Sequence, residues 1–302
     1  MNNLKEYLDK KQTLLAPEIK NPKFKALLDK TLANYVISKK HENVPKVIWG
    51  ENRYRLERSS SFRKLNLESK ENIYSHLSRL NLALSWYIER SGHNYGAKMI
   101  LMSKTQDEKS LYSLFVAEEA IHQREFENFI DFVPDPKIYW HPLLDPLSDA
   151  MRDGERETLL YVIQVLLEGY GIGLYTSLKE TCDIPELKKV YSRIISDEAK
   201  HHGSGVILIH DLNPSKLVKD QVFEYTRKFV IALQSADLLR STFEKEQTLT
   251  TKDKQKFYEE VEYEKIMNLR LTQLKAMLGK VDNWDLISKL EKEKVFKYKI
   301  KV

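Results

Sequence analysis

The sequence predicts an all-α protein built around a four-helix bundle, and three observations indicate this fold. Apolar residues recur with helical spacing along most of the chain, whereas the sequence lacks the alternating pattern of strands. The 302 residues are 42% hydrophobic and 31% charged with only 10 Gly and 9 Pro, a composition typical of helical proteins. Two pairs of long apolar-striped segments are each joined by a short turn-like stretch, which predicts two helical hairpins packed together.

The four segments of these hairpins are predicted to be the central helices, at residues 68–102, 106–132, 155–180 and 185–211. A loop that contains Pro134, Pro136, Pro142 and Pro146 separates the two hairpins.

Further helices are predicted on both sides of this core. Asn21 as a cap and Pro22 at the first helical position indicate a helix over 21–40. After the core, a helix is expected from 213–215 to about 246, and another from a Thr250 cap to Gly279. We therefore expect one helical domain, and its parts are a metal-binding core at 68–211 and flanking helices at 1–67 and 212–302.

Composition excludes several kinds of protein. The single cysteine, Cys182, excludes an internal disulfide and a cysteine-based metal cluster. The sequence has no apolar run of the roughly 18 residues that span a bilayer, and its N-terminus lacks the apolar centre of a secretion signal. We therefore expect a cytoplasmic protein outside the membrane.

Two Glu-x-x-His motifs lie in the core, at Glu119–His122 and at Glu198–His201. Positions three apart share one face of a helix, so each motif can direct a carboxylate and an imidazole toward one point. A lone acid in an apolar helix precedes each motif, because Glu89 lies thirty residues before Glu119 and Glu168 lies thirty before Glu198.

The equal spacing predicts that all six side chains meet. The midpoints of both intervals fall in the turn-like stretches at 103–110 and 181–188. Residues equally far from the turn of a hairpin lie at equal heights, here about 22 Å up each leg for fifteen residues. Four unpaired carboxylates in an apolar core would be prohibitively unfavourable, so we predict two divalent cations there. Mixed oxygen and imidazole ligands suit iron or manganese.

This pattern, with one Glu on each of two helices and Glu-x-x-His on the other two, resembles the ferritin-like dinuclear iron-carboxylate superfamily. The resemblance covers about residues 68–211 and implies a di-iron site, with Mn/Fe as the alternative. It also implies that the acids Glu118 and Asp197 accept hydrogen bonds from metal-bound imidazoles, Glu118 from His201 and Asp197 from His122.

Other residues near the motifs have open roles. His93 lies four residues after Glu89 and has three possible interpretations: an extra metal ligand, a residue that hydrogen-bonds to a ligand, or an ordinary interior or capping histidine. The segment EGYGIG (168–173) places three glycines in a helix, each unfavourable by ~1 kcal/mol relative to Ala. We expect Gly169 and Gly173 to let a neighbouring helix or a substrate approach closely. With Trp86 and Phe115 they are our candidates for a substrate cavity.

The resemblance implies several activities. The first is O₂ activation for oxidation of an organic substrate, by hydroxylation, desaturation, N-oxygenation or aldehyde deformylation. The second is iron oxidation of the bacterioferritin type, which the long flanks disfavour. A rubrerythrin-like peroxidase would carry a four-cysteine iron site, and this chain has one Cys. Two further families match less well: the ribonucleotide reductase radical subunit has Tyr where Phe126 stands, and arylamine N-oxygenases have His where Ile194 stands.

The expected partners follow from the leading activity. The sequence has no dinucleotide or flavin motif, so electrons would come from a separate reductase or from the substrate. The net charge of +5 is mild, and the basic stretches 53–64 and 289–301 are solvated surface or a docking site for an acidic carrier partner. A homodimer is compatible with these expectations.

Overall fold

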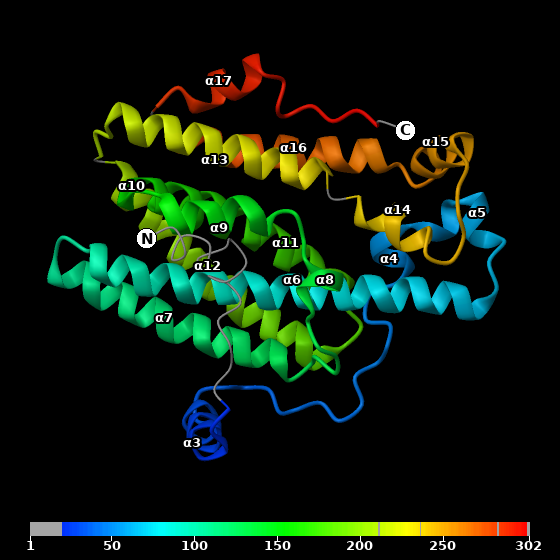
Figure 1. Ribbon diagram of the computed structural model, residues 1–302, viewed down its shortest axis with the longest axis horizontal. Coiled ribbons are helices and arrows are strands. Elements are labelled where there is room, and N and C mark those ends of the chain that lie inside the picture. The colour runs from blue at the N-terminus through cyan, green and yellow to red at the C-terminus, as the bar shows by residue number, and fades with distance from the viewer. Residues whose placement is uncertain (1–19, 211, 236, 283, 301–302) are drawn as a thin grey trace, which may run out of the picture.

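The computed structural model describes residues 20–210, 212–235, 237–282 and 284–300, and every regular element in these ranges is a helix (Figure 1). The all-α prediction is therefore confirmed for the described residues. Residues 1–19 of the predicted N-terminal flank lie outside them.

The first hairpin consists of α6 (Leu67–Met102) and α7 (Gln106–Glu127). Each helix begins at a side-chain cap: Asn66 accepts a hydrogen bond from the backbone N–H of Ser69, and Thr105 accepts one from Glu108. The turn between them is short, so the two helices run antiparallel in contact along their length.

The second hairpin pairs a composite helix with α12 (Pro185–His210). The composite helix joins α10 (Arg156–Leu159), the π-helical segment η2 (Leu160–Leu167) and α11 (Glu168–Thr181) without a break. Every side chain of η2 is buried. A π-helical segment this long is rare, and such distortions occur frequently at functional sites.

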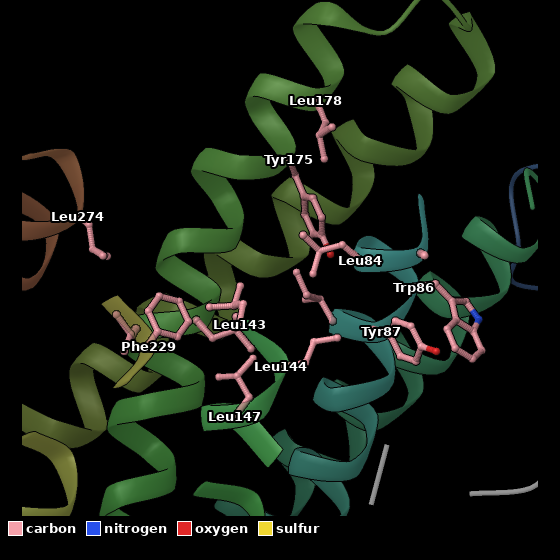
Figure 2. Packing of buried hydrophobic residues seen from close by; sticks show 14 of the residues in the cluster. Leu84, Trp86, Tyr87, Leu143, Leu144, Leu147, Tyr175, Leu178, Phe229 and Leu274 are labelled. Carbon is pink, nitrogen blue, oxygen red and sulfur yellow. The ribbon is translucent and has the colours of Figure 1, made fainter. Parts of the chain in front are cut away.

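Shorter helices surround the bundle. In Figure 1, α13, α16 and α17 lie on one side of it and α3 lies on the opposite side, while α4, α5, α14 and α15 gather near the start of α6. Their bounds are α3 (Pro22–Leu32), α4 (Glu51–Tyr54), η1 (Leu56–Arg58), α5 (Ser60–Arg63), α8 (Pro136–Tyr139), α9 (Leu144–Asp153), α13 (Lys216–Ser235), α14 (Leu238–Phe243), α15 (Thr251–Glu260), α16 (Tyr263–Gly279) and α17 (Leu286–Lys292). One cluster of buried apolar side chains extends from Ile48 to Val295, and Figure 2 shows part of it.

Several helix boundaries differ from the prediction. The predicted loop around Pro142 and Pro146 contains the start of α9, because a proline in the first turn lacks only an N–H that has no intrahelical partner. The helix expected up to residue 246 ends earlier and restarts as α14, whose N-cap is Asp237. The helix expected from Thr250 to Gly279 is divided between α15 and α16 at Glu262, which has a positive φ of 55°. Two further helices end before their predicted limits, at Leu32 and at Glu127.

The segment Arg156–Thr181 also needs a correction. It is long and apolar enough to cross a membrane by length and composition, although the sequence pattern was expected to contain no such run. In the structure 72% of its most apolar window is buried inside the protein. Its apolar composition is therefore explained by its place at the centre of the fold.

Gly169 lies where α11 contacts other elements. A Cβ at this position would stand 2.9 Å from Cε1 of His202 and against the Met277 sulfur of α16. The His202 ring is held in place by Nδ1, which lies 3.0 Å from the carbonyl oxygen of Val165. Gly169 therefore allows close packing, whereas Gly173 is exposed with open space around it.

We expect Gly169→Leu to lower the free energy of unfolding by ~1–3 kcal/mol, because the added side chain overpacks the contact with His202 and Met277. Gly173→Leu is the matched control on the same helix and should leave stability unchanged or raised. Thermal and urea unfolding of both variants would check this. Equal stability of the two variants would contradict the packing role of Gly169.

Candidate metal centre

The six acids and histidines of the predicted site come together in the core. Their oxygen and nitrogen atoms form two groups, and within each group all of the ligand atoms lie within 4.8 Å of one another. The first group consists of Glu89, Glu119, His122 and Glu198. The second group consists of Glu119, Glu168, Glu198 and His201. Glu119 and Glu198 belong to both groups, so they lie between two neighbouring ligand sets. This arrangement fits two cations bridged by carboxylates.

The hairpin geometry explains why the six residues meet. Glu89 on α6 faces the Glu119 motif on α7, and Glu168 on α11 faces the Glu198 motif on α12. The turns lie at 103–105 and 182–184, inside the predicted stretches. The whole set also repeats, because Glu89, Glu119 and His122 recur 79 positions later as Glu168, Glu198 and His201.

Each imidazole is fixed from behind by an acid of the other hairpin. Nε2 of His122 lies 3.2 Å from Asp197, and its Nδ1 lies 3.0 Å from Glu89. Nε2 of His201 lies 2.8 Å from Glu118, and its Nδ1 lies 3.2 Å from Glu119. Both rings therefore direct Nδ1 toward the carboxylates and Nε2 toward the supporting acid. This is the pairing expected from the sequence, and it is the usual support of a ligating histidine.

Without a cation the cluster retains protons. Burial, and then the neighbouring Glu89, raise the pKa of Glu119 to about 8. Burial acts to lower the pKa of His122, but hydrogen bonds with Asp197 and Glu89 outweigh it and raise the value to about 10. In the same way, Glu118 and Glu119 outweigh burial and raise the pKa of His201 to about 12. Metal ions would replace these protons, since ligands bind in their deprotonated forms.

Two residues beside the cluster had no specific role in the sequence-based prediction. A Cβ on Gly92 would stand 2.5 Å from the carboxyl carbon of Glu119, so the glycine makes room for that carboxylate. Gly92 follows Glu89 by three positions, and this shared helix face is the signal that could have revealed it. The hydroxyl of Tyr175 on α11 donates a hydrogen bond to Glu89 on α6 and closes the cluster from that side.

The π-helical segment η2 supports the same centre through Gln164. This fully buried amide accepts hydrogen bonds from Tyr95 and Tyr112, at 2.8 and 3.0 Å. Its nitrogen donates to the backbone carbonyl of His201 at 2.8 Å and to the Ser204 hydroxyl at 2.7 Å. The amide therefore links η2 to the turn of α12 that carries His201.

The remaining predicted residues are not gathered at one place. His93 is half-buried and belongs to neither ligand group. Phe115 packs on the ring of His201, with centroids 3.9 Å apart. Trp86 instead donates to Glu127 and packs on Tyr87, away from Tyr175 in Figure 2.

Of the two glycines predicted to open a space, Gly169 is closed by His202 and Met277, whereas Gly173 is exposed. The open position is Gly171, which is buried and lies three residues after Glu168. Its two chain neighbours and its own helix backbone aside, no described heavy atom lies within 4 Å of where its Cβ would be.

We expect Gly92→Ala to remain folded but to bind iron more weakly, by about tenfold or more, as changes in groups that orient ligands do. The added methyl displaces the flexible carboxylate of Glu119 rather than the backbone, and alanine favours the helix by ~1 kcal/mol. Gly173→Ala is the control, with the same change at an exposed site. Iron titration with parallel thermal melts checks this, and a Gly92→Ala protein with wild-type iron affinity would refute it.

Asp197→Asn should preserve the fold and weaken metal binding by ~10–100-fold, because the amide no longer supplies a charged acceptor for Nε2 of His122. Glu186→Gln, an exposed acid on the same helix, is the control. Competition titrations against a coloured chelator measure both affinities. Unchanged affinity in Asp197→Asn would mean that this hydrogen bond does not support a ligand.

Comparison with known proteins gives one match. Residues 165–271 match the family model described as Rubrerythrin, and this range includes Glu168, Glu198 and His201 but begins after the first hairpin. No curated protein and no solved structure matches the chain. The match and the buried cluster together confirm the resemblance predicted from the sequence: residues 165–271 match a Rubrerythrin domain of the ferritin-like di-iron-carboxylate superfamily, and the buried cluster is consistent with a dinuclear site.

Proposed function

We propose that this protein is an O₂-activating di-iron oxidoreductase that oxidises a small organic substrate, with Glu89, Glu119, His122, Glu168, Glu198 and His201 as the iron ligands. The observation that carries the proposal is the convergence of these donors in two overlapping groups inside the core. A buried set of four carboxylates is stable only when protons or cations compensate its charge, and cations do this without neutralising the ligands themselves. Two bound irons would supply the electrons and the open positions that O₂ chemistry requires.

The protein's own residues hold and shape this centre. Asp197 and Glu118 keep the two imidazoles in one orientation through Nε2. The hydroxyl of Tyr175 fixes Glu89, so that side of the cluster is enclosed. On the Glu168 side, buried Gly171 leaves the place of a Cβ free of contacts from other elements, so this side is packed less tightly. An enclosed centre that excludes water favours a reactive site over a plain storage site.

The overall reaction determines which partners are needed. In a hydroxylation, one oxygen atom of O₂ enters a C–H bond and the other leaves as water, which consumes two electrons and two protons. We propose that a separate reductase supplies these electrons in the cytoplasm. The basic stretch 289–301 is the proposed docking site for an acidic partner, since part of the stretch 53–64 is already paired, with Arg55 and Arg58 bound to Glu262.

The Rubrerythrin match favours a second candidate, the reduction of peroxide at the same centre. Against it stands the single cysteine, which excludes the four-cysteine iron site expected of such a peroxidase. Iron oxidation for storage is the third candidate.

We expect anaerobic loading with Fe(II) to give two irons per chain, and exposure to O₂ to oxidise both irons within single-turnover times. Metal counting with optical and Mössbauer detection checks the stoichiometry and the oxidation. Candidate substrates and hydrogen peroxide are then compared as co-reactants, with Glu168→Ala as the ligand-deficient control. One iron per chain, or none, would refute the dinuclear site. Assembly into a large iron-mineralising shell would refute the enzyme proposal.

A further inference from the structure

A cavity of about 150 Å³ lies between α6 and α11, where α4, α14 and α16 cover the gap between the two hairpins. Its size is below that of typical drug-sized ligand pockets, which suits a smaller molecule. A second cavity of about 70 Å³ shares four lining residues with it: His141, Tyr170, Tyr263 and Arg270. Neither cavity includes a residue of the metal centre.

The charge around this cavity is of one sign. Arg53 and Arg270 line it, and none of its lining residues, all in the described part of the chain, is acidic. Arg53 has five N–H donors, and one of them donates a hydrogen bond to the Ser177 hydroxyl at 3.1 Å. Burial lowers the pKa of Arg53, and the nearby Arg270 lowers it further. Burial also lowers the pKa of His141 to about 4, so this histidine is neutral at pH 7.

The rest of the wall is mainly apolar, with Leu77, Leu80 and Leu84 of α6 opposite side chains of α11 and α14. These three leucines are buried, whereas Arg270 is exposed and marks the rim. Two cations at one place and a leucine-lined interior are the two halves of a site for an amphipathic anion. The arginine geometry favours a carboxylate, which can accept two parallel hydrogen bonds from one guanidinium.

The cavity and the metal centre share two helices. Leu84 lies five residues before Glu89 on α6, and Leu174 lies six after Glu168 on α11. At the rise of an α-helix these offsets correspond to about 7.5 and 9 Å along the axes. Tyr175, next to Leu174, reaches across to Glu89 and stands on the cluster side of this gap, and Figure 2 shows it directed toward α6.

We propose that this cavity binds a small organic carboxylate, with its acid group on Arg53 and Arg270 and its apolar body against the leucines. Its use as the substrate of the metal centre rests on the function proposed above, whereas the binding itself does not.

Calorimetry on the metal-free, full-length protein tests the binding. We expect octanoate or benzoate to bind at one molecule per chain, and the preferred one reveals whether the body is aliphatic or aromatic. For that carboxylate, Arg270→Gln and Arg53→Gln should each weaken binding by about tenfold or more, the loss typical of a charge-assisted hydrogen bond. Lys265→Gln, an exposed cation on α16 outside the cavity, is the matched control and should bind like wild type. Leu239→Trp should fill the apolar part and reduce binding, with a thermal melt to show that it is folded.

The outcomes separate the site from its chemistry. No binding of either carboxylate, equal binding of octanol and octanoate, or equal binding of inorganic phosphate and octanoate would each overturn the proposed site. Wild-type affinity in both arginine variants would overturn it as well. Carboxylate binding in a protein that takes up no iron would leave the site standing and refute the proposed function. Two irons per chain without carboxylate binding would refute the carboxylate site and leave the proposed function standing.

Discussion

The burial of four carboxylates at one level of an apolar helical bundle is the constraint on which the rest of this structure depends. Such groups are far too unfavourable in a core unless protons or cations compensate their charge. In the metal-free state the protein compensates with protons, as the raised pKa values of Glu119 and both histidines show. The fold is therefore arranged around the charge of the site.

The compensation extends outward in layers. Asp197 and Glu118 hold the imidazoles, and the pKa of each acid is lowered. Burial acts to raise the pKa of Asp197, but hydrogen bonds with His122 and Lys200 outweigh it. The pKa of Glu118 is lowered mainly by its hydrogen bond with His201. Lys200 lies 2.6 Å from Asp197 and 3.6 Å from Glu118, so one cation bridges the two supporting acids. This lysine is exposed, and such pairs contribute little stability. Its effect is to orient the acids, because a supporting carboxylate that rotates away no longer fixes its histidine.

The sequence was sufficient to predict the centre because its spacing encodes the geometry. In each hairpin, the lone Glu and the Glu-x-x-His motif lie the same number of residues from the turn, on opposite sides of it. The six side chains therefore meet once the two hairpins pack together. The flanks were less predictable. The division at Glu262 depends on a positive φ, and no sequence pattern distinguishes it from a continuing helix. Likewise, the role of Gly169 depends on His202 and Met277, and Met277 approaches only in the tertiary structure. Local periodicity reports which face is buried but not which distant residue covers it.

The two halves of the centre share a repeat but not an environment, and this difference bears on function. The position that corresponds to Tyr175 in the first half, 79 residues earlier, is Gly96, which has no hydroxyl. Tyr175 therefore donates to Glu89 across the bundle, and Gly96 cannot offer the equivalent bond to Glu168. Gly171 corresponds to Gly92 in the repeat. The carboxylate of Glu119 fills the space beside Gly92, whereas the place of a Cβ on Gly171 has no contact from another element. The π-helical segment directly precedes Glu168 and so widens the helix on the open half. One half is therefore packed more tightly around its ligands than the other. A symmetric centre would suffice for holding metal, so this difference between the halves supports the proposed oxidoreductase over plain storage.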